Sequence, residues 1–237
     1  MSRISTFKKR LLSRDPLCGT FLKTPHYVMI EIFAQSNFDF ICLDGEHAPF
    51  DRAAMDQCLA VARALDFPVL VRVGDSSPRE ILWALDCGAV GIVVPHVKTV
   101  EMAKDIAKSA RFGNGGRGFA GSTRWASYTT RPMSDLMQQS LNETVVIAQI
   151  EEPEAVSCAQ AIGDVDGIDA LFAGPADLSV GMGFDHQDAP ELKQALQDIG
   201  RASKAAAVGY ASFIGNEEMA QHWAETYGVH KIGRAHV

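Results

Sequence analysis

The sequence lacks any apolar run long enough to cross a membrane. A transmembrane helix needs about 20 consecutive, mostly apolar residues, and no uninterrupted apolar stretch among the 237 residues approaches that length. The N-terminal segment MSRISTFKKRLLSRD is basic, but it has no continuous apolar core of the kind that defines a secretory signal peptide. We therefore expect a cytoplasmic protein without a signal peptide or membrane span.

The sequence also lacks paired cysteines and an excess of positive charge. Its five cysteines are odd in number and form no C-x-x-C pair, which favours small buried thiols in a reducing compartment. The formal net charge is -7, so the surface gives no reason to expect nucleic acid or an anionic membrane as a partner. An anionic substrate remains compatible with this charge, because an arginine or a metal ion can reverse the field inside a cleft.

What is present is a regular alternation of apolar runs with helical patterns. Short continuous apolar runs are typical of buried parallel strands, and the alternation repeats seven times. A crossover between parallel strands needs a helix, so the pattern predicts an α/β domain that most simply forms a TIM (β/α)8 barrel. The predicted strands are residues 17–22, 38–44, 67–73, 89–97, 145–151, 168–174 and 208–214.

An open, doubly wound sheet is the rival architecture. It would be favoured by a G-x-G-x-x-G turn after the first strand, but LCGTFLKTPH does not contain one. The glycine-rich stretch GNGGRGFAG at 113–121 follows a helical pattern instead. A dinucleotide cofactor is therefore not expected.

The eighth strand–helix unit is apparently missing. After Gly228 the chain reads VHKIGRAHV, whereas a further strand and helix would need roughly 20 residues. The final IGRAHV has neither a strand nor a helix pattern. We expect one barrel domain at residues 1–231, a non-native tail at 232–237, and a natural product that continues further. A barrel left open would expose its first and seventh strands as unpaired edges.

Polar side chains cluster where the predicted strands end. Glu151 and Asp177 follow the fifth and sixth strands, and Gln149 precedes Glu151 on the same side of its strand. A parallel sheet brings these tips together, and two carboxylates with open positions suit Mg²⁺ or Mn²⁺. Each carboxylate taken alone is more often a helix cap or a solvated turn.

Two more strand tips carry groups suited to acid–base and anion chemistry. The second strand ends in Asp44-Gly45-Glu46-His47, in which Asp44 can orient the His47 ring as a general base requires. Arg72 lies near the end of the third strand, where its burial requires an anionic partner. Either a substrate carboxylate or a structural Asp or Glu would serve. His96 is a further tip residue.

A long loop at 113–132 separates two helical patterns. It is rich in glycine and arginine and has no apolar period, and loops of this length are usually functional or disordered. Arg124 and Trp125 in this loop could close over the barrel mouth, or they could pack on the surface. We expect Arg117, Ser122, Arg124 and Trp125 to influence which substrate is accepted.

Taken in order, these blocks resemble the HpcH/HpaI aldolase family of metal-dependent (class II) pyruvate aldolases. This family includes 4-hydroxy-2-oxo-heptane-1,7-dioate aldolase and 2-dehydro-3-deoxyglucarate aldolase. The resemblance extends from about Leu17 to Gly228. It is carried by the segments GTFLK, FDFICLDGEHAPFD, PVLVRV, ALDCGAVGIVVPHV, GGRGFAGSTRW, VIAQIEEPEAV and IDALFAGPADLSVGMG.

The resemblance implies a (β/α)8 barrel and assigns a role to each strand tip. Glu151 and Asp177 would hold Mg²⁺, Mn²⁺ or Co²⁺, and Arg72 would bind the keto or enolate oxygen of pyruvate. His47, supported by Asp44, would transfer protons. Gln149 would lie beside metal and substrate, and the pyruvate carboxylate would be received by the backbone at Gly174, Pro175 and Ala176. Family members end in an eighth strand and a helix exchanged between subunits of a hexamer, so a homo-oligomer is expected.

The predicted activity is cleavage of a 2-keto-4-hydroxy acid to pyruvate and an aldehyde through a metal-stabilised pyruvate enolate. No lysine lies at a matching strand tip, which argues against a Schiff base; Lys23 is the nearest competitor. Three alternatives remain open. They are oxaloacetate decarboxylation, a malyl- or citramalyl-CoA-type lyase, and a non-catalytic barrel that binds a metal and a keto acid. The sequence shows no obvious basic patch for the phosphates of coenzyme A.

Overall fold

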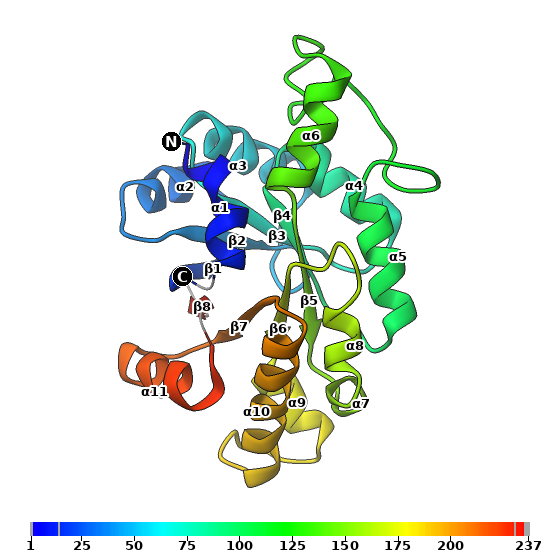
Figure 1. The fold of residues 1–237 in the computed structure, drawn as a ribbon. Helices are drawn as coiled ribbons and strands as arrows, with labels where there is room; N and C mark the ends of the chain where they lie inside the picture. Colours follow the sequence, from blue (N-terminus) through cyan, green and yellow to red (C-terminus); the bar gives the residue numbers. More distant parts are fainter. Residues whose placement is uncertain (1, 14, 230, 235–237) are drawn as a thin grey trace.

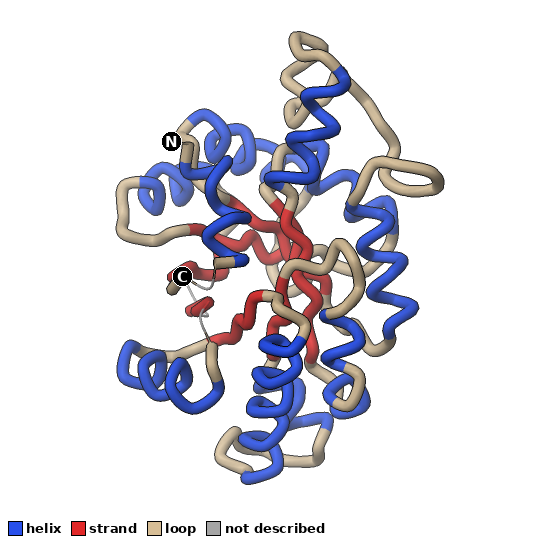
Figure 2. Tube along the Cα trace, in the orientation of Figure 1, coloured by secondary structure: helices blue, strands red, loops and turns tan. Residues whose placement is uncertain are grey.

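A barrel of parallel strands surrounded by helices forms the core of the protein. The structure is a computed structural model that describes residues 2–13, 15–229 and 231–234. Figure 2 shows the strands at the centre and the helices outside them. The strands are β1 Leu17–Leu22, β2 Phe40–Asp44, β3 Val69–Arg72, β4 Gly91–Val94, β5 Val145–Ile150, β6 Ala170–Ala173, β7 Gly209–Phe213 and β8 Lys231–Arg234.

Helices follow each of the first seven strands, and one more precedes β1. They begin at the signals that their sequences carry. Asp51 caps α3, Thr99 caps α5, and Ser77 with Pro78 opens α4. The helices are α1 Arg3–Leu12, α2 Tyr27–Ala34, α3 Arg52–Ala64, α4 Pro78–Cys87, α5 Val100–Ala110, α6 Met133–Glu143, α7 Pro153–Val156, α8 Ala159–Gly163, α9 Pro175–Gly181, α10 Pro190–Ala205 and α11 Glu217–Tyr227.

The sheet closes on itself in the order β1 to β8, and every neighbouring pair is parallel. The predicted (β/α)8 class is therefore confirmed, with an incomplete eighth unit. β8 pairs with both β1 and β7 (Figure 1), and no helix follows it within the described part of the chain. The prediction that IGRAHV forms no strand was wrong for 232–234, because pairing on two sides supplies the order that the residue pattern does not. Residues 235–237 of the predicted tail lie outside the described residues.

Alternation along the strands separates two hydrophobic layers. Side chains that point into the barrel, such as Leu70 and Ile147, form one core. Helix α1 closes this core at the end where the strands begin, with Ile4, Phe7 and Leu11. Side chains that point outward pack against the surrounding helices in a second, larger core. Every second residue of a strand therefore faces the barrel interior, and at the strand ends these inward positions are polar.

Candidate active site

The inward positions at the carboxyl ends of β2, β3 and β5 bring the predicted polar residues together. Asp44 pairs with Arg72 in the β2–β3 register, so the two side chains lie side by side. Gln149 and Glu151 follow Ile147 on the inward face of β5. All four are buried, with Asp44 and Gln149 fully so. The carboxyl end of a parallel barrel is where TIM-barrel active sites lie.

Arg72 and Asp44 form a two-point ion pair. Arg72 Nε is 3.0 Å from Asp44 Oδ1, and Arg72 Nη2 is 2.7 Å from Oδ2. Burial alone would raise the pKa of Asp44, but the hydrogen bonds from Arg72 and from the His47 backbone, with the charge of Arg72, lower it. The anionic partner of Arg72 in this structure is therefore a structural carboxylate. The third guanidinium nitrogen, Nη1, does not contact Asp44. It lies 3.3 Å from Glu46 Oε2 at the mouth of the barrel.

His47 lies at the mouth with a largely exposed ring. Asp44 Oδ1 accepts hydrogen bonds from the backbone N–H groups of Glu46 and His47, at 3.3 and 3.0 Å. The His47 Nε2 atom is 3.6 Å from Glu46 Oε2. The expected support of His47 by Asp44 is thus made through the backbone, and the carboxylate next to the ring is that of Glu46.

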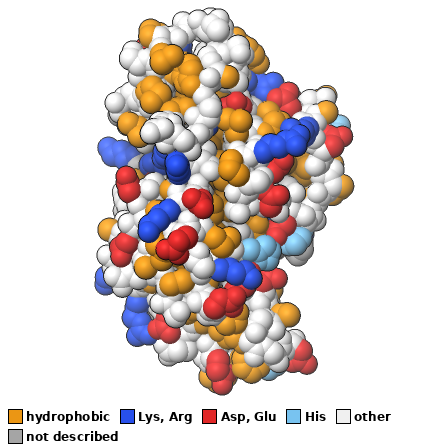
Figure 3. Space-filling model, turned by 90° about the vertical axis from the view of Figure 1, so that its right-hand side faces the viewer, with side chains coloured by type: hydrophobic (Ala, Val, Ile, Leu, Met, Phe, Trp, Pro, Cys, Tyr) orange, Lys and Arg blue, Asp and Glu red, His pale blue; other side chains and the backbone are white. Residues whose placement is uncertain are grey.

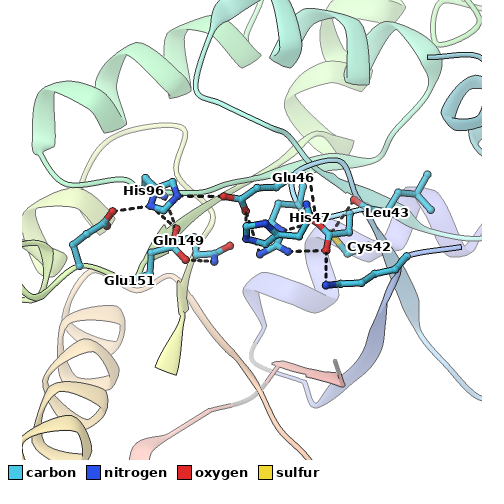
Figure 4. A network of polar contacts seen from close by, with 11 residues as sticks. Cys42, Leu43, Glu46, His47, His96, Gln149 and Glu151 are labelled. Carbon is cyan, nitrogen blue, oxygen red and sulfur yellow. Dashed lines mark hydrogen bonds and ion pairs between the residues drawn. The ribbon is translucent and has the colours of Figure 1, made fainter. Parts of the chain in front are cut away.

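Glu46 lies between the Asp44–Arg72 pair and the group around His96 and Glu151. This residue was not singled out from the sequence. Its Oε1 atom is 3.2 Å from His96 Nε2 (Figure 4), and its Oε2 atom is 3.3 Å from Arg72 Nη1 and 3.6 Å from His47 Nε2. The backbone N–H of His96 donates to Glu151 Oε1 at 2.7 Å, and its ring Nδ1 is 2.7 Å from Glu152 Oε1. The position of Glu46 inside the D-G-E-H block was the available signal.

His96 is held among three carboxylates. Burial alone would lower its pKa, but Glu152, Glu151 and Glu46 together raise it. Its backbone has a positive φ of 57°, which orients the N–H toward Glu151. One ring nitrogen of His96 and carboxylate oxygens of Glu151 and Glu152 lie within 4.8 Å of one another. These three residues are close enough together to hold a cation, and they share Glu151 with the predicted Glu151–Asp177 pair.

Glu151 lies beneath the turn that begins α9. Burial raises the pKa of Glu151, and the nearby charge of Asp177 raises it further, against hydrogen bonds from His96 and Gln149. A Cβ added to Gly174 would lie 2.8 Å from Glu151 Cβ and 3.0 Å from its Oε2, so only glycine permits this close approach.

The residues around Glu151 suit a hard divalent cation. Gln149 Nε2 donates to Glu151 Oε2, whereas the buried Gln149 Oε1 has no partner among the described residues. Glu151 and Gln149 thus supply a buried carboxylate of raised pKa and an unpaired amide oxygen, and the charge of the exposed Asp177 acts on Glu151 from the α9 turn. These groups match the preference of Mg²⁺ or Mn²⁺ for oxygen ligands.

A cavity of about 700 Å³ opens at this end of the barrel. Asp44, His47 and Arg72 line it on one side, and the α9 turn with Asp177 lines it on another. Glu151 and Gln149 lie below that turn. Lys23, the only lysine among the lining residues, has its Nζ atom 3.6 Å from Asp44 Oδ2.

The long loop after α5 does not contribute to this mouth. It follows the carboxyl end of a helix, so it lies at the opposite end of the barrel from the strand tips. Arg124 pairs there with Asp56 and donates to Cys87 O at 3.0 Å. Arg117 is buried, with its guanidinium over the neighbouring rings of Phe112 and Trp125, and it pairs with Asp86. The expectation that Arg124 and Trp125 close over the mouth of their own barrel was wrong, because these side chains anchor the loop to α3 and α4.

Buried carboxylates, an arginine and histidines at the carboxyl end of a parallel barrel are arranged as in the active site of a TIM-barrel enzyme. The family model described as HpcH/HpaI aldolase/citrate lyase matches residues 17–233. The chain belongs to this family, and the resemblance inferred from the sequence is confirmed.

Individual relatives support the same placement. A 4-hydroxy-2-oxo-heptane-1,7-dioate aldolase of Salmonella dublin is 33% identical over 224 residues, which cover 93% of this chain and 84% of the relative. A family protein of Burkholderia cenocepacia J2315 superposes with a TM-score of 0.90 at 30% identity, covering 98% of this chain and 92% of the other. The citrate synthase SbnG gives a TM-score of 0.86 at 29% identity, covering 97% of this chain and 90% of the other.

Within the described residues, no helix is both long and apolar enough to span a membrane.

Proposed function

We propose that the chain is a divalent-metal-dependent aldolase that cleaves a 2-keto-4-hydroxy acid to pyruvate and an aldehyde. The observation that carries the proposal is the convergence of the buried Arg72 guanidinium and the Asp177 carboxylate on one cavity, with Glu151 buried beneath the adjoining turn and subject to the charge of Asp177. Carbon–carbon cleavage next to a ketone generates negative charge on the keto oxygen, and a site of this kind stabilises such charge. The aldolase name of a relative at 33% identity supports the same reaction.

Glu151 and Asp177 would hold the cation, with Gln149 Oε1 beside it. When bound, the cation would supply Lewis-acid polarisation of the substrate keto group. The remaining steps belong to residues of the chain. Arg72 uses Nε and Nη2 for Asp44, which fixes the plane of the guanidinium and leaves Nη1 directed toward the mouth. Nη1 is therefore the N–H donor that we assign to the oxygen on which charge develops.

The substrate carboxylate is assigned to the turn before α9. The Gly174 N–H already donates to Ile150 O at 3.0 Å, and Pro175 has no N–H. Of the three predicted turn residues, Ala176 thus supplies the backbone donor, while Gly174 gives room and Pro175 fixes the turn. The first turn of a helix favours an anion because its N–H groups lack helical acceptors.

His47 is assigned the proton transfer at the C4 hydroxyl. In cleavage the hydroxyl proton passes to the His47 ring, the C3–C4 bond breaks, and its electron pair flows toward the keto oxygen. The aldehyde departs, and a proton added at C3 completes pyruvate. The exposure of the ring at the mouth allows it to exchange that proton with water.

Coenzyme A esters fit the cavity less well than free keto acids. Lys23 and Arg72 are the two cations among its lining residues, and both lie beside Asp44. A diphosphate would need unpaired basic groups in addition to these.

Exchange of the pyruvate methyl protons for deuterium tests the proposal. We expect exchange with Mn²⁺ or Mg²⁺, followed by proton NMR, and its loss after chelation with EDTA. Glu151→Gln and Asp177→Asn should each abolish exchange and metal dependence, whereas Asp198→Asn on the outer helix α10 should leave both unchanged. Exchange that persists after exhaustive chelation, or inactivation by borohydride in the presence of pyruvate, would favour a Schiff base at Lys23 and refute the proposal.

A further inference from the structure

The cavity holds more space than a small keto acid requires. Its volume of about 700 Å³ falls in the range of roughly 300–1,000 Å³ that accommodates drug-sized ligands. The groups assigned to the keto acid occupy one side, formed by β2, β3 and the α9 turn. Another side, which adjoins Arg72, is built from β1, the end of β7 and the start of α11.

The side built from β1, the end of β7 and the start of α11 is an apolar wall, which consists of Phe21, Phe213, Ile214, Met219 and Trp223. Phe21 and Phe213 pack against each other in a tilted arrangement, with ring centroids 4.6 Å apart. Phe213 also packs edge-on against Phe172, with centroids 4.7 Å apart, so the base of the wall is rigid. Met219 and Trp223 lie one helical turn apart on α11 and extend the wall toward solvent.

Among the side chains that the structure describes, the apolar wall offers few polar groups with which to bind hydroxyls. Apart from residues assigned to the keto acid, Lys23 and Gln187 are the polar side chains described along the cavity. Lys23 is engaged by Asp44 at 3.6 Å. A hydroxyl placed against aromatic rings loses its hydrogen bonds to water without replacement, and this loss disfavours binding.

We infer that the aldehyde formed or consumed at this site has an apolar body, alkyl or aryl, which packs on Phe213, Met219 and Trp223. A polyhydroxylated aldehyde is the wrong class for this wall. The inference rests on the proposed function, since it assigns the second substrate of the same reaction. In the direction of synthesis, C3 of pyruvate bonds to the aldehyde carbon, one methyl proton leaves, and one proton adds to the former carbonyl oxygen.

Matched aldehydes provide the test. With pyruvate and Mn²⁺, kcat/KM for product formation should be at least about tenfold higher for propanal than for glyceraldehyde, which has the same carbon chain with two hydroxyls. Lengthening the aldehyde to hexanal should raise kcat/KM further. Equal values for propanal and glyceraldehyde, or a tenfold preference for 4-oxobutanoate over butanal, would overturn the inference.

Variants locate the effect on the wall. Met219→Ala and Trp223→Ala should each reduce the preference for hexanal over propanal severalfold, through KM rather than kcat, and leave pyruvate exchange unchanged. Met137→Ala on α6 is the control, because Met137 and Met219 are similarly exposed, at 37% and 40%. Should Trp223→Ala fail to fold, Met219→Ala alone decides. An unchanged preference in Met219→Ala refutes the inference, whereas absent pyruvate exchange in the wild type refutes the proposed function itself.

Discussion

At the scale of single residues, the site depends on one buried ion pair. Asp44 has no exposed surface, and its carboxylate oxygens accept four hydrogen bonds, two from Arg72 and two from backbone N–H groups. Removing one member of a buried pair typically costs about 3–5 kcal/mol, and here Lys23 beside Asp44 and Glu46 beside Arg72 would offset part of that loss. Arg72→Ala should therefore lose stability as well as activity, so its kinetic effect must be measured on folded protein.

The lowered pKa of Asp44 predicts a pH dependence of stability. A carboxyl whose pKa is lower in the folded state stabilises the protein above its unfolded pKa of about 3.9, and this stabilisation is lost as pH falls through the folded value. The free energy of unfolding in urea should drop below about pH 4 more steeply for wild type than for Asp44→Asn. Parallel curves for the two proteins would contradict the assignment.

At the scale of elements, β4 and β5 approach too closely for any side chain larger than hydrogen at Gly91. A Cβ there would lie 2.3 Å from Val145 O and 2.7 Å from Val145 Cβ. β5 carries Gln149 and leads directly into Glu151, so the separation of these two strands sets the position of the acidic half of the site.

Gly91→Ala should therefore destabilise the barrel by about 1–3 kcal/mol, because it forces the two strands apart. Urea denaturation would measure the loss. Gly118→Ala is the matched control, since a Cβ at Gly118 meets no atom within 4 Å. A Gly91→Ala variant as stable as the control would show that the strands separate without cost.

Elements also show how far the sequence could be read. Apolar runs located β1 to β7, because burial on both faces leaves a continuous pattern, and the strand tips followed from that. The segment PEAVSCAQAIG at 153–163 has the pattern of one continuous helix, whereas the structure divides it into α7 and α8. The contact between Glu46 and His96 joins residues far apart in sequence, and no local pattern reports such a contact. The sequence left open whether Arg124 and Trp125 in the loop at 113–132 close over the mouth or pack on the surface, and only the placement of α5 shows that the loop lies at the other end of the barrel.

At the scale of the whole molecule, acidic residues outnumber basic ones, but the two kinds of charge are dispersed among each other. The net charge is -7, yet acidic and basic side chains are interspersed over the face shown in Figure 3. The long-range field therefore repels an anionic keto acid weakly, while Arg72 attracts it only at short range. Burial shields the second effect from salt but not the first.

Raising ionic strength from about 10 to 150 mM should accordingly increase kcat/KM for pyruvate exchange, by less than about threefold. NMR exchange rates at several salt concentrations would measure the change, with the aldehyde omitted so that the keto acid alone is observed. A decrease with salt would instead indicate that the protein attracts the keto acid from a distance.

The pairing of β1 with β8 has a consequence for the order of folding. Leu17 of β1 lies opposite Lys231 of β8 in the sheet. One edge of β1 therefore stays uncovered until β8 has been synthesised. Contacts between such distant parts of a chain form slowly, since a large loop must close first. On the ribosome, β1 with β2 and β3 would persist as an incomplete sheet until nearly all of the described chain has emerged. Chaperones that shield strand edges would have their greatest effect on the yield of this protein during that interval.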